Sequence, residues 1–597
     1  MARKTKTPYK TKWNLNLLYT GLNNPRIERD VRTIEREYDN FAKIYRNKDF
    51  TKTPKNLAKA LASKEKISQG LSKIDPEFYF SRLLDIESQN EKARALLTKI
   101  DERLTEASNK LEFFHLRIAN IPKEKHGKYL KASELKPYKY LLENIFRTAK
   151  YNLSEKEEQL VSLLGQTSYS MWVDSQEKLL SKQMIKFGKG MIPISKAMSI
   201  ISELPKAKRI ALHKEIIQTL ESINHLAEAE INAIVNFKKV MDKRRGFKKP
   251  YSATILSYEN DEKEVEALVS MITKKFSISH RFYKLHAKLI GEKRITLPDR
   301  GAPIGKIKRK FDFANTVEIV RSALGDVDGS YSDILDRYLK NGQIDVYPYK
   351  GKQSGGYCAK SGDLPTFILL NHTDDLRSVE TLGHEIGHAI HGELAKTQPH
   401  RYRGFSTSTA EVASTFFEQV TQSKIEEKLN NEEKIIFLHN KIMGDIATIF
   451  RQIALFNFED ELHERIRKEG QLSGIQVAKL LAKHLRSYLG ASVEVTDRDG
   501  YGFIPWSHIR YFFYVYSYAY GQIVSKALFE MWNENKNTAK KIERFLKAGR
   551  SMSPKNIFKS IGINVSDPKF FEFGLKNIEK DIDKLEKLTR KMKFKIA

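Results

Sequence analysis

Residues 384–388 read His-Glu-Ile-Gly-His, and this pentapeptide constrains its surroundings more than any other segment of the chain. The apolar residues around it recur at helical spacing on several sides, which predicts a buried helix: Val379, Leu382, Ile386, Ala389 and Ile390. In a helix, positions i and i+4 lie on one face with Cβ atoms about 5–6 Å apart. His384 and His388 can therefore bind one metal ion, which would offset the cost of burying two imidazoles.

Glu385 follows the first histidine directly, so it cannot reach the metal from the same helix face, but it can take a proton from a water bound there. This H-E-x-x-H arrangement is typical of zinc peptidases. The alternative is an amphipathic helix with two partly exposed histidines and a solvated glutamate. Gly387 costs the helix up to about 1 kcal/mol relative to alanine. A close approach by a neighbouring segment or by the metal site would explain this glycine.

A catalytic zinc ion needs a third protein ligand and an open fourth position. The metzincin pattern would place glycine at 391 and histidine at 394, where the chain has His391 and Leu394. Serine and threonine at 406–409 predict a second helix, antiparallel to the first, with Glu411 in its first turns. We expect Glu411 to be the third ligand, the alternative being a glutamate favoured by the helix dipole. Glu418, on the same face, is either a surface residue or a hydrogen-bond acceptor for a ligand histidine.

The composition indicates a large protein with little cysteine. With 597 residues, 40% of them apolar, the chain can bury a large core in two or more lobes. The chain has no apolar run of 18 residues, so no membrane span is expected, and the basic N-terminus lacks the apolar stretch of a secretory signal. The single cysteine, Cys358, fits a reducing cytosol, so we expect a cytoplasmic location.

The net charge of +30 raises the question of a nucleic-acid partner. Basic residues are spread along the chain and interleaved with acids, as in 261–266 and 424–428, and no basic tract with stacking aromatics stands out. We therefore expect no specific nucleic-acid partner and attribute the charge to a lysine-rich composition. A basic cleft that favours acidic peptides is left open.

Periodicity predicts a largely helical chain. Helical patterns cover most of it: residues 27–146, 151–201 with a turn near 187–190, the region from 206, residues 426–486, and the region from 537 to the C-terminus. The mixed segment 341–371 predicts a small sheet. We divide the chain into an N-terminal helical lobe, residues 1–200, and a catalytic region, residues 201–597.

Several segments, in their order along the chain, resemble the thimet oligopeptidase family of zinc peptidases, and its oligoendopeptidase F branch in particular. These segments are 12–19, 345–358, 367–371, the helix of His384, 410–415, 488–490, 499–501 and 508–521. They span nearly the full length, while the middle of the N-terminal half carries little of the pattern.

The resemblance implies a role for each residue of the metal site. It implies that His384, His388 and Glu411 bind one Zn²⁺ per chain and that Glu385 is the general base. One position departs from the pattern: Ser378, ahead of the zinc helix, stands where an acidic residue is expected. Any role of that position around the metal is therefore in doubt.

The resemblance also implies substrate-binding residues. His508, with Tyr514 and Tyr516, resembles the set that hydrogen-bonds the substrate and the developing oxyanion, and Tyr511 is a further candidate for substrate binding. The residues that resemble the strand edge for an extended peptide are Gly355, Gly356 and Tyr357. The residues alone leave helix and strand open for 511–520, where a single tyrosine is more often core than site.

The implied protein is a mostly helical, two-lobed, zincin-type metallopeptidase with a small sheet beside the zinc helix and a deep substrate channel. Its implied activity is zinc-dependent endopeptidase cleavage of short unstructured oligopeptides. One alternative is a zinc carboxypeptidase or dipeptidyl carboxypeptidase, which would need a cation such as Arg510 or Lys352 for the terminal carboxylate. The other is a non-catalytic, basic protein that binds nucleic acid or a partner. The oligomeric state is undetermined by the sequence.

Overall fold

The structure is a computed structural model that describes residues 9–592. Helices make up 72% of it, which confirms the mostly helical fold expected from the periodicity. Several helices begin where the sequence supplies a cap: Asn24, Thr53 and Asp75 each accept a hydrogen bond from the first turn of a helix that starts with proline. No helix within residues 9–592 is long and apolar enough to cross a membrane.

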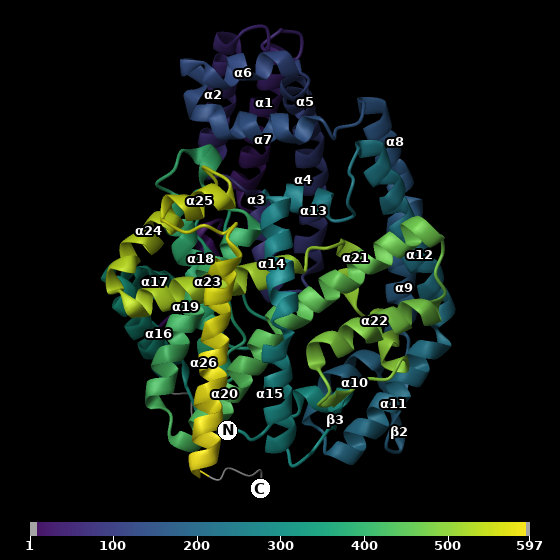
Figure 1. Cartoon of the computed structure of the whole chain (residues 1–597). Helices are drawn as coiled ribbons and strands as arrows, with labels where there is room; N and C mark the ends of the chain where they lie inside the picture. The colour runs from purple at the N-terminus through teal and green to yellow at the C-terminus, as the bar shows by residue number, and fades with distance from the viewer. Residues whose placement is uncertain (1–8, 593–597) are drawn as a thin grey trace.

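The N-terminal helices project beyond the rest of the molecule, at the top of Figure 1. They are α1 (Pro25–Tyr45), α2 (Pro54–Leu71), α3 (Pro76–Ile86), α4 (Glu91–Asn109), α5 (Glu112–Ala119), α6 (Lys123–Lys131) and α7 (Lys139–Ala149). Phe41, Phe50 and Leu142 belong to the apolar cluster that holds their outer part together. The expected helical stretch 27–146 is therefore confirmed as a succession of separate helices.

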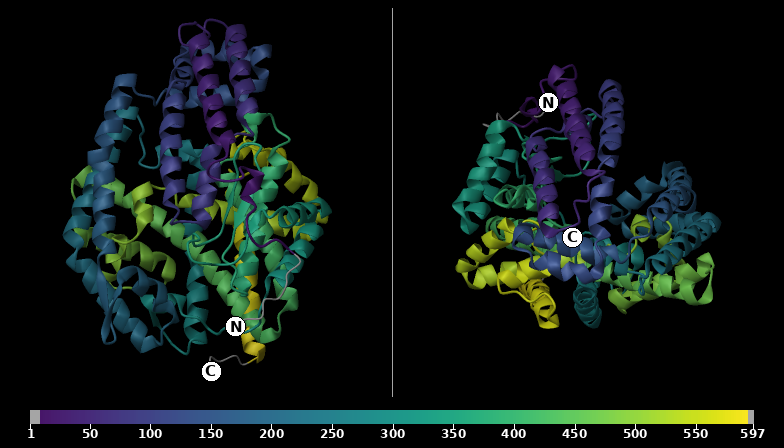
Figure 2. Two further views of the ribbon diagram at one scale, coloured as in Figure 1. Left: turned by 180° about the vertical axis from the view of Figure 1, so that it is seen from behind. Right: turned by 90° about the horizontal axis from the view of Figure 1, so that it is seen from above.

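The other helices form the body of the molecule, which Figure 2 shows from behind and from above. Its first half contains α8 (Glu155–Gly165), α9 (Met171–Ser181), α10 (Ile194–Ile200), α11 (Lys206–Ser222), α12 (Asn224–Arg245), α13 (Ser252–Ser257), α14 (Glu262–Lys274) and α15 (Phe276–Leu289). Its second half contains α16 (Phe313–Val327), α17 (Gly329–Asn341), α18 (Leu376–Ala395), α19 (Thr407–Lys428), α20 (Asn431–Asp445), α21 (Arg451–Glu469), α22 (Gly474–Leu489), α23 (Tyr516–Glu534), α24 (Ala539–Lys547), α25 (Pro554–Ser560) and α26 (Pro568–Met592).

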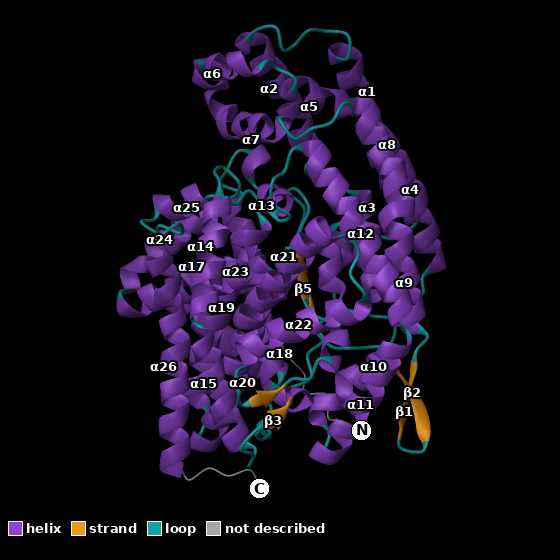
Figure 3. Ribbon diagram, turned by 45° about the vertical axis from the view of Figure 1, so that its right-hand side comes forward, coloured by secondary structure: helices purple, strands orange, loops and turns teal. Residues whose placement is uncertain are grey.

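The strands are short and form small patches among the helices (Figure 3). An antiparallel hairpin pairs β1 (Met184–Phe187) with β2 (Gly190–Pro193), and β3 (Ile295–Thr296) pairs in parallel with β7 (Val493–Glu494). The third sheet contains β4 (Ile344–Asp345), β6 (Phe367–Leu369) and β5 (Tyr357–Ala359), in the order β4-β6-β5. This sheet lies in the segment 341–371, where the sequence predicts it.

The N-terminal segment is attached to this third sheet rather than to its own helices alone. The backbone N–H of Trp13 donates to Asp345 Oδ2 at 3.0 Å, and its indole N–H donates to the carbonyl oxygen of Ile368 at 2.8 Å. Residues from α3 and from the sheet join Trp13 in one apolar cluster, among them Phe80 and Phe367.

The division of the chain at residue 200 stays a prediction.

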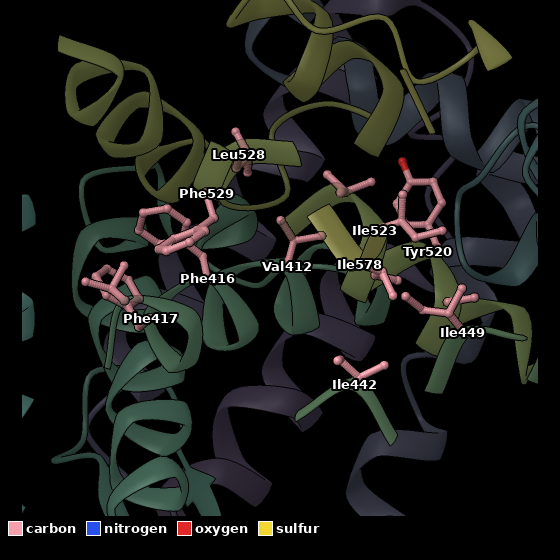
Figure 4. Close-up of a cluster of buried hydrophobic side chains, with 14 of the residues drawn as sticks. Val412, Phe416, Phe417, Ile442, Ile449, Tyr520, Ile523, Leu528, Phe529 and Ile578 are labelled. Carbon is pink, nitrogen blue, oxygen red and sulfur yellow. The ribbon is translucent and has the colours of Figure 1, made fainter. Parts of the chain in front are cut away.

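Two apolar clusters fill the body. Figure 4 shows part of the larger one, in which Val412 and Phe416 of α19 gather with Ile523 and Leu528 of α23 and Ile578 of α26. The second cluster lies between α11, α12, α21 and α22 and contains residues such as Leu212, Ile231, Leu462 and Leu481. The larger cluster includes apolar residues of α18, so the helix with the histidine pair is anchored in the main core.

Helices α18 and α19 pack closely because glycine stands at their contact. A Cβ on Gly387 would lie 2.8 Å from Ser414 Cα, and a Cβ on Gly383 would lie 2.4 Å from Thr421 Oγ1. The close approach expected for Gly387 is thus made by α19. This packing fixes the distance between the histidines of α18 and the acidic residues of α19.

Candidate active site

His384, His388 and Glu411 come together between α18 and α19. Their ligand atoms all lie within 4.8 Å of one another, and among the described residues they are the one such group of histidine, cysteine and acidic side chains. The Nε2 atom of His384 lies 3.8 Å from Glu411 Oε2, and Nε2 of His388 lies 4.0 Å from Glu411 Oε1. Zinc binds such nitrogen and oxygen donors at about 2.0–2.2 Å, so the three residues fit a zinc ion.

Glu418 forms a hydrogen bond with His384 through the ring nitrogen that does not face Glu411. Nδ1 of His384 lies 2.8 Å from Glu418 Oε2, and a carboxylate at this distance accepts the Nδ1 hydrogen. The Nε2 atom is then the donor atom left for a metal ion. Although burial acts to lower it, the hydrogen bond and charge of Glu418 raise the pKa of His384 to about 9. Burial and the neighbouring His384 lower the pKa of His388 to about 3.

Glu385 is buried on the side of α18 that faces strand β5. A Cβ on Gly356 would lie 2.6 Å from Thr381 Cγ2 and 3.7 Å from Glu385 Oε1, so glycine permits this contact. Burial raises the pKa of Glu385 to about 7; His384 opposes the shift, while Glu411 and Glu418 add to it. A carboxylate whose pKa lies near neutrality suits transfer of a proton in either direction.

Ser378, which was expected ahead of the helix with the histidine pair, lies in the first turn of that helix, because α18 begins at Leu376. The backbone N–H of Ser378 donates to Asp375 Oδ1 at 2.8 Å, and its hydroxyl donates to the same atom at 2.8 Å. Asp375 is the N-cap of α18, so the acidic residue that stabilises this helix end lies three residues before Ser378. The side chain at 378 therefore takes part in this cap.

Strand β5 is the edge of its sheet and runs beside α18. Ile368 of the central strand β6 and Leu370, which directly follows that strand, donate their N–H groups to Gln343 and Asp345 on the β4 side, both at 2.8 Å. Leu369, the residue between them, pairs with Tyr357 of β5. The alternation of an antiparallel pair directs the N–H and C=O of Cys358 to the open edge.

Gly355 is the first of the three edge residues that were expected to bind substrate. A hydrogen bond to its carbonyl oxygen holds it in place. The side-chain amide of Asn371 donates to the carbonyl oxygens of Gln353 and Gly355, at 2.9 and 2.8 Å. Gly355 and Gly356 also line a cavity of about 380 Å³ at the N-terminal end of α18. The Gly pair thus lies between this cavity and Glu385.

The phenol of Tyr357 points away from the zinc helix. Its hydroxyl donates to Asp85, at the end of α3, and the guanidinium of Arg82 lies 5.2 Å from the centre of its ring. The side chain therefore belongs to the contact between β5 and the N-terminal helices. What Tyr357 can offer at the strand edge is its backbone.

His508 and Tyr514 are joined by a hydrogen bond between Nδ1 and the phenol oxygen. The Tyr514 oxygen lies 3.3 Å from the hydroxyl of Tyr518, a residue that sequence reasoning did not single out. The sequence signal that could have found Tyr518 was its spacing of four residues from Tyr514, which brings two side chains together in a helix. The structure resolves the choice between helix and strand here, because α23 begins at Tyr516. Burial lowers the pKa of His508 and raises that of Tyr514, so a neutral ring faces a protonated phenol.

Tyr516 and Tyr511, the other two expected site tyrosines, are placed differently. Tyr516 is fully buried, and its hydroxyl donates to Asn260 Oδ1 at 3.0 Å. Tyr511 is 62% exposed, with its ring centre 5.9 Å from that of Tyr514. The structure therefore groups Tyr511 and Tyr518 with Tyr514, and Tyr516 with the core.

Helix α23 brings these tyrosines towards Glu411. A Cβ on Gly521 would lie 2.8 Å from Glu411 Cβ, so the two helices touch at the third ligand. Tyr518 precedes Gly521 by three residues, about 4.5 Å along the helix axis at 1.5 Å per residue. The contact at Gly521 thus places Tyr518, the hydrogen-bond partner of Tyr514, within about one helical turn of Glu411.

The backbone before Tyr514 is strained and firmly held. Phe512 and Phe513 have φ values of 47° and 64°, which are unusual for residues other than glycine. The N–H of Phe513 donates to Glu459, and Thr254 Oγ1 donates to the carbonyl oxygen of Phe512 at 2.8 Å. These two hydrogen bonds hold the turn in place. Each strained residue in it raises the free energy of the folded state by about 1–3 kcal/mol.

The two cations considered for a terminal carboxylate are already paired. Arg510 makes two hydrogen bonds of 2.6 Å with Glu230, and both side chains are buried. Lys352 Nζ lies 2.7 Å from Asp345 Oδ1, in a pair with almost no exposed surface. Neither residue is free for a substrate carboxylate, so the carboxypeptidase alternative loses both of its candidates.

Comparison with known proteins finds matches over most of the chain. Residues 320–576 match the family model described as peptidase family M3, and residues 117–182 match the one described as oligopeptidase F. Oligopeptidase PepF of Bacillus subtilis (strain 168) is 25% identical over 553 residues, covering 90% of this chain and 82% of its own. The oligoendopeptidase F homolog of Borreliella burgdorferi is 25% identical over 595 residues, covering 97% of this chain and 98% of its own.

Solved structures show the same fold. A crystal structure assigned as a peptidase from Chlamydophila abortus has a TM-score of 0.86 at 21% identity and covers 98% of this chain and 99% of its own. The oligoendopeptidase-F of Enterococcus faecium has a TM-score of 0.68 at 17% identity, covering 95% of this chain and 98% of its own. The likeness to these structures shows the fold. The two family matches, which together cover more than half of the chain, and the curated relatives show that the chain belongs to peptidase family M3, in its oligoendopeptidase F group, and is a metallopeptidase that acts on oligopeptides.

Proposed function

We propose that this protein is a zinc-dependent endopeptidase of short unstructured peptides. The observation that carries the proposal is the arrangement of His384, His388 and Glu411 as one ligand set, with Glu385 buried between that set and the edge strand β5. A zinc ion bound by the three ligands would supply Lewis acidity, which lowers the pKa of a water and polarises a carbonyl group.

Glu385 is assigned as the general base. Its carboxylate lies against Gly356, at the edge where a substrate backbone would run. It accepts the proton of the attacking water and returns it to the amine that leaves. The raised pKa of Glu385, about 7, supports both transfers near neutral pH.

The edge of β5 is assigned as the binding site for the substrate backbone. An extended peptide adds a strand to an open sheet edge through main-chain hydrogen bonds, which do not depend on sequence. Gly356 offers no side chain that would obstruct the approach beside Glu385. This mode requires an unfolded substrate, because a folded protein has its own backbone groups paired.

Tyr514 is assigned as the donor to the developing oxyanion, with His508 positioning it. When His508 carries its hydrogen on Nδ1, it donates to the phenol oxygen and leaves the phenol hydrogen for the substrate. One such donor contributes about 2.7–4 kcal/mol to the stability of the transition state. Tyr514 is preferred over Tyr516 because the hydroxyl of Tyr516 is engaged with Asn260 in the core.

Cleavage of a peptide blocked at both ends tests the proposal. An internally quenched peptide with an acetylated N-terminus and an amidated C-terminus is expected to be cut, and a chelator should abolish the cleavage until Zn²⁺ is restored. A carboxypeptidase would cut only the peptide with a free C-terminus. Cleavage that persists after the metal is removed and proven absent would refute the zinc mechanism.

The single cysteine, Cys358, supports action in a reducing cytoplasm.

A further inference from the structure

Lys360 follows the edge strand on the same face as Gly356 and Cys358, because side chains two residues apart share one side of a strand. That face is turned to α18. A Cβ on Gly392 would lie 3.3 Å from Lys360 Cδ and 3.9 Å from its Nζ. Gly392 comes four residues, about one helical turn, after His388. The alkyl chain of Lys360 therefore lies about one turn along the zinc helix from a metal ligand.

The ammonium group of Lys360 has polar contacts but no counter-ion. Its Nζ donates to the carbonyl oxygen of Arg403 at 3.2 Å and lies 3.8 Å from the centre of the Phe405 ring. Within residues 9–592, no carboxylate lies within ion-pair distance of it. The acids nearby are engaged elsewhere: Glu393 pairs with Arg337 and Lys396, and Asp363 pairs with Arg403.

This lack of a counter-ion distinguishes Lys360 from Arg510 and Lys352, the two cations considered above for a substrate carboxylate. Arg510 and Lys352 are buried with Glu230 and Asp345, so their charges are neutralised within the fold. Lys360 keeps an exposed side chain. Even so, the surrounding protein removes part of its hydration, and this desolvation, with the charge of Lys396, lowers the pKa of Lys360 to about 8. An anion arriving beside such a cation would stabilise its charged form.

We propose that Lys360 binds a carboxylate of the substrate peptide, either an acidic side chain or the C-terminus, and thereby gives this enzyme a preference for peptides with negative charge near the scissile bond. The proposal rests on the proposed endopeptidase function and names its substrate class. Lys360 follows Gly356 by four residues on a strand that rises about 3.3 Å per residue. The carboxylate is therefore expected within about four residues of the scissile bond.

Matched peptides and the substitution Lys360→Met test this assignment. Methionine keeps an unbranched apolar chain against Gly392 and Phe405 and removes the charge. A set of internally quenched peptides would carry aspartate or asparagine at each of the positions around the cleavage site, with both ends blocked. We expect the wild-type enzyme to favour aspartate at one position by about tenfold in kcat/KM, as for a partly desolvated ion pair. Lys360→Met should abolish that preference and leave the asparagine peptides unaffected.

A second arm of the experiment identifies the source of the carboxylate. Neutral peptides of increasing length, each with a free or an amidated C-terminus, would be compared in the same two enzymes. A preference for the free terminus at one length, lost in Lys360→Met, would assign the subsite to the terminal carboxylate. Lys360→Glu should reverse the sign of either preference, so that lysine-bearing or amidated peptides become the better substrates.

Lys396→Met is the matched control. Lys396 lies near Lys360, but it pairs with Glu393, which keeps Arg337 as a partner after the substitution. The preference for acidic peptides should therefore survive in this variant. Equal rates for the aspartate and asparagine peptides at every position, and for both kinds of C-terminus, in the wild-type enzyme would overturn the proposal whether or not Lys360→Met folds. A wild-type enzyme that cuts no peptide of the set, neutral ones included, would instead refute the endopeptidase function.

Discussion

A hydrogen bond of 2.8 Å between Nδ1 of His384 and Oε2 of Glu418 links the zinc helix α18 to α19. Because Glu411, the proposed third ligand, lies on the same face of α19, one helix supplies both a candidate ligand and the group that orients another candidate ligand. The close contact at Gly387 and Ser414 holds the two helices at this distance. The proposed metal site is therefore formed by one helix pair rather than by a loop.

Glu418→Gln should weaken zinc binding by about 10–100-fold, because the amide is a poorer acceptor and no longer adds negative charge behind His384. Competition with a chromophoric chelator would measure the zinc affinity of the purified enzyme. Glu427→Gln, on the exposed end of the same helix, is the control and should leave that affinity unchanged. An unchanged affinity in Glu418→Gln would show that the hydrogen bond does not orient the ligand.

Glu385→Gln should keep about one zinc ion per chain and lose about 10²–10⁴-fold in kcat, because glutamine cannot take the proton of the attacking water. Elemental analysis would give the metal content, and a quenched peptide would give the rate. Activity close to that of the wild type would contradict the assignment of Glu385 as general base.

Glu411→Ala should lose the metal ion, because the remaining histidines offer two ligands where a catalytic zinc site has three. Metal content after dialysis against a weak chelator is the measurement. Retention of one zinc ion per chain would mean that a different residue is the third ligand.

Tyr514→Phe should lower kcat by about 10²–10³-fold with little change in KM, because it removes a donor used in the transition state. Tyr516→Phe should leave kcat nearly unchanged and lower the free energy of unfolding by about 1 kcal/mol, because it removes the hydrogen bond to Asn260. Steady-state kinetics and chemical denaturation would separate the two effects. A large loss of kcat in Tyr516→Phe alone would reverse the assignment.

Gly387→Ala should destabilise the protein by about 1–3 kcal/mol and impair zinc binding, because the new methyl group would lie 2.8 Å from Ser414 Cα. Gly127→Ala, at a helical glycine of α6 with no neighbouring atom within 4 Å of the new Cβ, should instead stabilise the protein by up to about 1 kcal/mol. Unfolding by urea would measure both changes. Equal effects of the two substitutions would show that close packing is not the reason for Gly387.

The sequence by itself determined the candidate metal ligands, which stay a prediction, and the helices that carry them. The spacing of His384 and His388 and the cap residues before Glu411 depend on local helix geometry, which neighbouring residues dictate. The small sheet at 341–371 could be located in the same way, although not its strand order.

Only the tertiary structure decided which groups those residues meet. Tyr516 rather than Tyr518 was expected at the site, but the packing of α23 sends the first hydroxyl to Asn260 and the second to Tyr514. Likewise, Arg510 is paired, whereas Lys360 has no counter-ion among residues 9–592. The physical reason is that the helical period fixes which side chains share a face of a helix. The residues that contact that face come from segments hundreds of residues away, and packing selects them.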